Sequence, residues 1–87
     1  MSEIKGKIIK IIDPVKGEGK NGPWKKQEFI FETEGQYPKK VCIANWNDKV
    51  SADDLKMGEE YTVSINIESR DYNDRWYTEI KMWKVEK

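Results

Sequence analysis

Apolar and polar residues alternate along much of the chain, which is typical of β-strands that bury one face. The clearest case is "EYTVSINIES", where Tyr61, Val63, Ile65 and Ile67 share one face and polar side chains share the other. Similar alternation, or a β-branched run, recurs along the chain. Five strands are therefore expected, at residues 3–12, 24–33, 39–46, 60–69 and 76–86.

The inward positions of these strands predict one hydrophobic core. Its expected members are Phe29, Phe31, Val41, Ile43, Val63, Ile65, Ile67 and Ile80, with Thr78 and Met82 on the inner face of the last strand. Trp83 and Val85 have the opposite parity, so they either cover the outside of the sheet or pack inward beyond a bulge. Gly6, inside the isoleucine-rich first strand, indicates a bend or a bulge.

Three segments that connect the expected strands differ from them in composition. Residues 13–23, "DPVKGEGKNGP", concentrate Gly, Pro, Asn and Asp and predict a mobile loop of about a dozen residues. Residues 47–60 predict a short helical turn that Ser51 or Asp48 caps and that Leu55 and Met57 fix to the core. The polar stretch 70–76 reads as a hairpin loop, with Tyr72 at its tip.

Five strands with a helical element between the third and the fourth match the OB-fold, a five-stranded Greek-key barrel. An SH3-like barrel is the main alternative, but it usually lacks that middle element. We therefore predict an all-β fold, with residues 1–87 forming a single OB-fold domain.

Composition limits the chemistry that is available. Sixteen basic and sixteen acidic residues balance, so the overall field is weak, but the first 26 residues carry seven lysines against three acids. This asymmetry favours a local basic surface. With one cysteine and no histidine, the chain has no internal disulfide and no histidine-based triad, and no run is long enough to span a membrane. We expect a soluble cytoplasmic protein that is not an enzyme.

No motif predicts a catalytic, cofactor or metal site. The adjacent pairs Asp53-Asp54 and Glu59-Glu60 are interpreted as solvating charges, and Cys42 as a partly buried filler. The glycines of "GEGKNG" lack the spacing and the following helix of a phosphate-binding loop.

Aromatic and basic residues are interleaved, as a single-stranded nucleic-acid groove requires. In an OB-fold the second and third strands form the binding face, and the hairpin loops on either side border it. The candidate stacking residues are Trp24, Trp46, Tyr72 and Trp76. The candidate phosphate contacts are Lys20, Lys25, Lys26, Lys39, Lys40, Arg70 and Arg75.

Two resemblances support this interpretation. "VCIANW", "LKMGEE" and "SRDYNDRWYTEI" resemble the C-terminal part of the bacterial single-stranded-DNA-binding domain, which implies base stacking at Trp46 and Tyr72. Nearly the whole chain is similar to a family of short, uncharacterised OB-fold domains of gut bacteria and their phages. The matching segments are "GKIIKI", "NGPWKKQEFIFET", "GQYPKKVCIANW" and "ESRDYNDRWYTEIKMWKVE". The chain departs from the longer proteins in having no acidic C-terminal tail, and in having Asn47 where they usually have Gly.

The expected function is non-sequence-specific binding of single-stranded DNA in replication, recombination or repair, in the host cytoplasm if the protein comes from a phage. A protein-interaction module that uses the same aromatics, and a single-stranded RNA binder, are the alternatives. A replication protein is a candidate partner, and an exposed edge of the first strand would allow a homo-oligomer.

Overall fold

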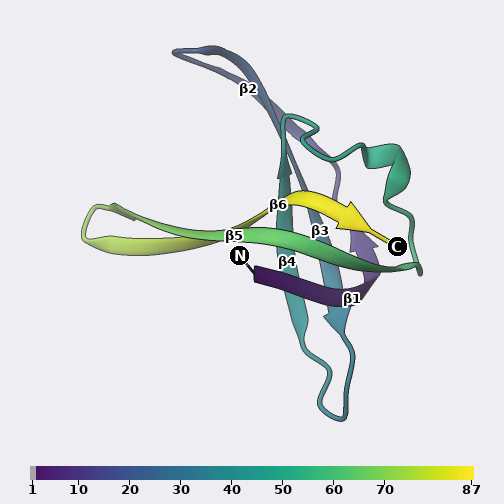
Figure 1. The fold of residues 1–87 in the computed structure, drawn as a ribbon. Helices are drawn as coiled ribbons and strands as arrows, with labels where there is room; N and C mark the ends of the chain where they lie inside the picture. The colour runs from purple at the N-terminus through teal and green to yellow at the C-terminus, as the bar shows by residue number, and fades with distance from the viewer. Residues whose placement is uncertain (1) are drawn as a thin grey trace.

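The computed structural model describes residues 2–87, which form six β-strands and one short 3-10 helix (Figure 1). The strands are β1 (Ser2–Ile11), β2 (Val15–Gly19), β3 (Gly22–Thr33), β4 (Lys40–Trp46), β5 (Glu60–Tyr72) and β6 (Arg75–Glu86), and the helix is η1 (Ala52–Asp54). The all-β prediction is confirmed, with six strands in place of five. The helix has only three residues and cannot cross a bilayer, and no longer helix occurs between residues 2 and 87.

Five of the strands are paired in a closed ring. β1 pairs with β5 through its first half and with β3 through its second half, and β3 pairs with β4. β4 meets β6 in parallel at Ala44–Lys81, and β6 returns along β5. β2 lies outside the ring and, among residues 2–87, pairs with β3 alone.

Gly6 is where β1 passes from one neighbour to the other, because it pairs with both Tyr61 and Thr33. A Cβ atom at Gly6 would lie 2.7 Å from the carbonyl oxygen of Glu32, so only glycine fits this close approach. The irregularity in β1 falls later, between Ile8 and Lys10. The glycine therefore marks the crossing and not the bulge.

The core fills the ring with the buried side chains of Ile8, Phe29, Phe31, Ile43, Val50, Leu55, Tyr61, Val63, Ile65 and Met82. Val41 and Ile80 pack against its edge. Three predicted inward positions were wrong. Ile67 and Thr78 are exposed because β5 and β6 continue beyond the ring, and Met57 is exposed because η1 ends before it.

A bulge in β6 decides the orientation of its last residues. Val63 pairs with Val85, whereas Ile65 pairs with Met82, so β6 carries one residue more than β5 between these pairs. The extra residue allows both Met82 and Val85 to pack on the core, and Trp83 lies within the bulge.

Two predicted loops are largely hairpin strands. Residues 13–23 include β2, which pairs with β3 from Val15–Lys26 to Gly19–Gly22, so the expected long loop was wrong. The stretch 70–76 is also strand, apart from a two-residue turn at Asn73 and Asp74, whose φ angles are 53° and 63°. Positive φ at both positions is typical of the tight turn that matches strand twist.

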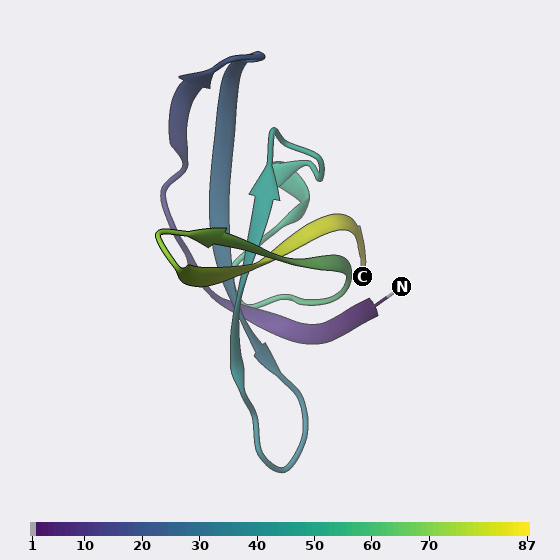
Figure 2. The ribbon, with the colours of Figure 1, turned by 90° about the vertical axis from the view of Figure 1, so that its left-hand side faces the viewer.

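Both hairpins project from the ring, as do the residues that connect β3 and β4 (Figures 1 and 2). The β2–β3 hairpin lies at one end of the molecule and the β3–β4 connection at the other. The outer half of the β5–β6 hairpin, residues 66–81, is called the arm below. It extends sideways between these two ends (Figure 1).

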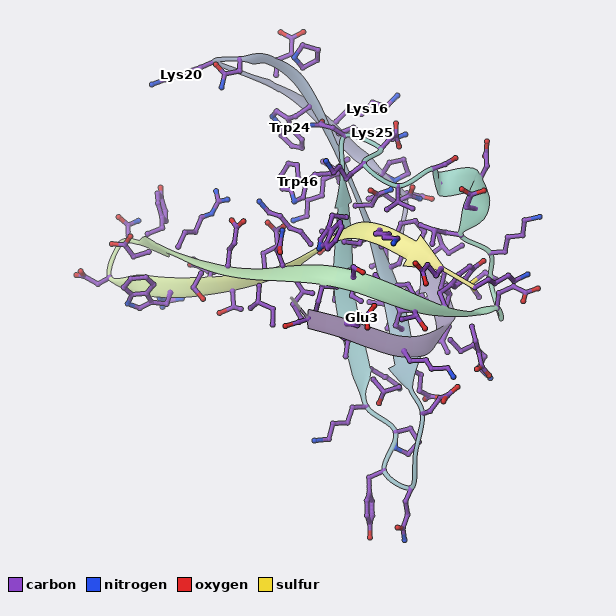
Figure 3. The ribbon with its side chains drawn as sticks, viewed as in Figure 1. Glu3, Lys16, Lys20, Trp24, Lys25 and Trp46 are labelled. Atoms are coloured by element: carbon purple, nitrogen blue, oxygen red, sulfur yellow. The ribbon has the colours of Figure 1, made fainter. Side chains whose placement is uncertain are left out.

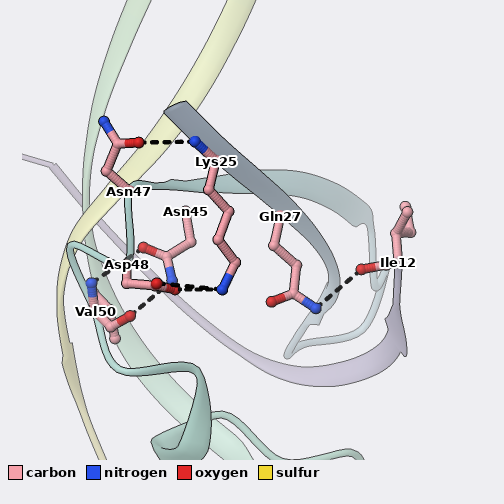
Figure 4. Close-up of polar contacts among 7 residues, drawn as sticks. All are labelled: Ile12, Lys25, Gln27, Asn45, Asn47, Asp48 and Val50. Carbon is pink, nitrogen blue, oxygen red and sulfur yellow. Dashed lines mark hydrogen bonds and ion pairs between the residues drawn. The ribbon is translucent and has the colours of Figure 1, made fainter. Parts of the chain in front are cut away.

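A buried asparagine organises the connection from β4 to η1. The side chain of Asn45 donates to the carbonyl oxygen of Val50 at 2.8 Å and accepts from its N–H at 3.1 Å (Figure 4). Both polar groups of this amide are thereby satisfied in the core. Ser51 precedes η1, but its side chain makes no capping hydrogen bond, whereas Leu55 is buried as predicted.

Candidate functional site

Two tryptophans meet on the outer face of the sheet. Because Phe29 and Phe31 of β3 face the core, the alternating positions Trp24 and Lys26 face outward. Lys26 is also the register partner of Trp46 at the end of β4. The two indole centroids are 5.7 Å apart with a 53° angle between the rings, and both side chains lie on the same side of the ribbon (Figure 3).

Two lysines flank the Trp46 ring. The Nζ atoms of Lys26 and Lys81 lie 5.4 and 5.5 Å from its centroid, within the range of cation–π attraction. Lys81 reaches this position from β6, through the single parallel contact of β6 with β4 at Ala44. Trp46 is therefore an aromatic surface with two ammonium groups beside it.

Carboxylates hold these lysines in place. Glu79 lies 3.1 Å from Nζ of Lys26 and 3.9 Å from Nζ of Lys81, and Glu68 lies 3.4 Å from Lys81. Lys26 also has Glu28 at 3.9 Å. An anionic ligand must therefore compete with internal carboxylates, Glu79 first, for both cations.

An open groove connects the tryptophans to the β2–β3 turn and to the arm. One hollow of about 450 Å³ is lined by Gly19, Lys20, Asn21, Gly22, Pro23, Trp24, Trp46, Asn47, Arg70 and Lys81. A second hollow, lined by Lys26, Glu28, Trp46, Arg70, Tyr77, Thr78 and Glu79, shares Trp46 and Arg70 with the first. We call the two together the tryptophan groove.

The two faces of the arm differ in chemistry. Arg70 pairs with Tyr77, and Tyr72 pairs with Arg75, so these four residues share the groove side. Tyr72 and Arg75 lie further out, next to the turn, and do not line either hollow. Trp76 pairs with Asp71 and projects from the opposite face, away from Arg70.

Three of the candidate lysines lie away from the tryptophan groove. Nζ of Lys25 forms an ion pair with Asp48 at 3.1 Å (Figure 4). Since side chains alternate along β3, Lys25 lies on the opposite side of this strand from Lys26. Lys40 is the first residue of β4 and Lys39 precedes it, and six residues of strand put Lys40 about 20 Å from Trp46. The groove thus brings together Trp24, Trp46, Lys20, Lys26 and Arg70 from the predicted set.

A larger hollow of about 580 Å³ lies on the other side of Trp24 and is lined by Lys16, Gly17, Glu18, Pro23, Trp24, Lys25, Asn47 and Asp48. It contains one aromatic ring, and its Lys25 and Asp48 neutralise each other. We favour the smaller groove, because it combines two adjacent rings with cations near them.

Backbone features fix the tryptophan groove locally. Asn47 has φ of 51°, a conformation that asparagine tolerates and glycine adopts freely, which explains why it can replace the glycine of the longer proteins. Its side-chain oxygen accepts from the backbone N–H of Lys25 at 2.8 Å, and its own N–H donates to the Lys25 carbonyl at 2.7 Å (Figure 4). These bonds join the end of β4 to β3 beside Trp24.

The groove residues that sequence reasoning did not propose include Asn47, Tyr77, Glu79 and Lys81. The alternation of β6 contained a signal for three of them, because Met82 was expected inward and odd-numbered neighbours therefore outward. Their closeness to Trp46 depends on the parallel contact of β4 with β6, which the linear pattern does not reveal.

Cys42 lies on the same outer face of β4, beside Glu28. Its side chain is exposed, so the expectation of a partly buried filler was wrong. Desolvation by the neighbouring side chains, together with the hydrogen bond from Sγ to Glu28 Oε2 at 3.3 Å, raises the pKa of Cys42 from 9.0 to about 11. The thiol is therefore protonated at neutral pH. Within residues 2–87, no three Cys, Asp or Glu side chains are grouped in a way that could hold a metal ion.

The sequence and the structure of the chain were compared with those of known proteins. A family model described as "Domain of unknown function (DUF3127)" matches residues 3–86. No curated protein matches the sequence. The structure is similar to the crystal structure of the SSB domain of a protein from Synechococcus sp., with a TM-score of 0.66, 13% sequence identity, and coverage of 97% of this chain and 90% of that one. The likeness supports the predicted OB-type fold.

Proposed function

We propose that this chain, which belongs to the family of the domain of unknown function DUF3127, is a non-sequence-specific single-stranded DNA-binding protein. The observation that carries the proposal is the pair of adjacent tryptophans flanked by Lys26 and Lys81 in an open groove. Bases stack on aromatic rings whatever their identity, and cations beside the rings contact phosphates, so this combination favours binding without sequence readout. The SSB-like fold fits the same function.

Each part of the tryptophan groove has a role in this proposal. Trp24 and Trp46 stack on successive bases, and Tyr77 and Tyr72 extend the aromatic track along the arm. Lys20, Lys26, Lys81 and Arg70 contact phosphates on both sides of the rings. We further propose a cytoplasmic role in replication, recombination or repair, with a replication protein as a candidate partner.

Quenching of tryptophan fluorescence by oligo(dT) tests the proposal. We expect saturable quenching, similar affinity for mixed-sequence oligonucleotides, and a slope of log K against log salt of about −3 for four phosphate contacts. Titration with oligo(U) would separate the RNA alternative, which predicts tighter binding to RNA. Absence of oligo(dT) binding at low salt and high micromolar concentration would refute the proposal.

A protein-interaction module is the second candidate. The acidic residues around Lys26 and Lys81, together with exposed aromatics, would suit a basic or apolar peptide as well as a nucleic acid. In that case no oligonucleotide would quench the tryptophan fluorescence of the protein.

A further inference from the structure

The arm has an open strand edge. β5 runs from Glu60 to Tyr72, but β1 pairs with it only as far as Ser2–Ile65. Beyond Ile65, β5 pairs with β6 on one side and, within residues 2–87, with no strand on the other. The backbone N–H and C=O groups on that side are thus available to another strand (Figure 1).

An apolar stripe lies along the core-side face of the arm. Ile67 pairs with Ile80, and Asp71 pairs with Trp76, on the face that continues from the buried pair Ile65–Met82. Ile67 is 58% exposed and Trp76 is 71% exposed. The tryptophan groove lies on the opposite face, so nucleic-acid binding does not account for this stripe.

The polar pair within the stripe is already satisfied. The hydroxyls of Ser69 and Thr78 lie 2.9 Å apart and hydrogen-bond to each other between the Ile67–Ile80 pair and Trp76. Neither hydroxyl therefore needs a partner from another chain, and Asp71, which lies on the same face opposite Trp76, keeps its charge in solvent when only the strand edge is paired.

The open edge is complementary to itself. When two copies of a strand pair antiparallel about a two-fold axis, one residue lies opposite itself and its neighbours pair symmetrically. A register centred on Ser69 is the one that pairs the whole open length, residues 66–72. The same register places Glu68 opposite Arg70 of the second copy, and Arg70 opposite its Glu68, so two ion pairs form.

We propose that the arm is a homodimerisation surface, on which the β5 edge pairs antiparallel with the β5 edge of a second copy about Ser69. The two arms then form one four-stranded sheet, with both apolar stripes on one face and both tryptophan grooves open on the other. Glu68 uses one oxygen for Lys81 at 3.4 Å and has a second for the guanidinium across the axis. Edge charges that repel other strands are compensated in this pairing.

Site-directed cross-linking tests the register. In a Cys42→Ser background, Ser69→Cys places two thiols opposite each other across the axis, so mild oxidation should give a covalent dimer. Thr78→Cys is the matched control, because it lies on the same face but one strand away from the edge, and it should stay monomeric. Absence of the Ser69→Cys dimer, or equal cross-linking of both variants, would overturn the proposal.

Charge reversal supplies an independent readout without cysteines. Sedimentation should show a concentration-dependent dimer for the wild type, and Glu68→Arg or Arg70→Glu alone should shift it to monomer through like-charge contacts. The double variant Glu68→Arg/Arg70→Glu should restore the dimer. A wild type that is monomeric up to high micromolar concentrations, or a double variant that stays monomeric, would contradict the proposal. No nucleic acid is present, so the outcome is independent of the proposed DNA binding.

Discussion

Trp46 shows how one residue combines stacking and charge in this protein. Its ring has an ammonium group about 5.5 Å from its centroid on β3 and another on β6, and both are paired with Glu79. The side chains of Glu79 and Lys26 are only 24% and 29% exposed, so solvent screens their ion pair less than one at an open surface. The carboxylate therefore orients the cations and also competes with a phosphate for them.

Replacing Glu79 by Gln should tighten binding to oligo(dT) by about two- to fivefold at low salt, because an exchange of one ion pair for another is worth less than about 1 kcal/mol. The difference should shrink as salt increases. Glu86→Gln is the matched control, since it removes the same charge from a pair with Lys84 that does not line the groove. Equal effects of the two substitutions would show that only net charge matters.

Cys42 allows a pH test of its surroundings. With a folded pKa of about 11 against 9.0, the thiolate fraction at pH 8 should be about a hundredfold lower than in the unfolded chain, and alkylation slower accordingly. The folded state favours the protonated thiol of Cys42. The stability that this preference contributes is therefore fully present below pH 9, and it is lost as the pH rises to about 11. Glu28→Gln should accelerate alkylation of the folded protein. Equal rates for folded and unfolded chains would contradict the assigned environment.

At the scale of elements, the β2–β3 hairpin positions Trp24. Gly17 is the register partner of Trp24, and the indole lies directly against its backbone, where a Cβ atom would overlap the ring. A glycine opposite an aromatic residue is a recurrent way to cover a strand that lacks side chains. The missing side chain of Gly17 thus leaves space for the Trp24 ring, so this glycine does more than make β2 flexible.

Gly17→Ala should displace the Trp24 indole and lose part of the about 1–3 kcal/mol that stacking on one base provides. Gly19→Ala is the control, because its Cβ would lie 3.6 Å from the nearest Trp24 atom, an ordinary contact. Both substitutions reduce the flexibility of the unfolded chain equally, so melting temperatures should stay similar. Affinities measured by oligo(dT) titration should differ between the two variants. Identical affinities would remove Trp24 from the interface.

The alternating pattern predicted correctly which side of a strand each residue faces. It did not predict whether another part of the protein covers that side. Phe29, Phe31 and Ile65 are buried as expected, because each lies on the part of a strand that borders the ring. Ile67 follows the same alternation but is exposed, since parity gives the side of a strand and not whether anything covers that side. The Gly-rich segment before Trp24 was interpreted as a loop, because its pairing depends on β3 and not on its own residues.

At the scale of the whole molecule, ring closure assembles the groove. Trp24 and Trp46 meet through the β3–β4 register, which hairpin reasoning can reach. Lys81 and Glu79 join them only because β6 returns between β5 and β4, a long-range pairing that a linear sequence does not specify. The aromatic candidates were therefore predictable from the sequence, but the ion pairs that hold their cations were not.

Closure also separates the two faces of the molecule. Trp46 lies in the groove, and Trp76 lies on the opposite face of the arm with Ile67. If the groove binds single strands by stacking, the two tryptophans must respond differently to the same ligand. Trp76 is therefore an internal control for the role of Trp46 in the proposed function.

The most direct test compares Trp46→Ala with Trp76→Ala in oligo(dT) titrations at one low salt concentration, using a labelled oligonucleotide so that loss of a tryptophan does not change the signal. Trp46→Ala should weaken binding by about 1–3 kcal/mol, which is the stacking energy of one base, and Trp76→Ala should leave it unchanged. Melting curves will confirm that both variants are folded at the temperature of the titration. Equal losses in the two variants, or a loss only in Trp76→Ala, would contradict single-strand binding in the tryptophan groove.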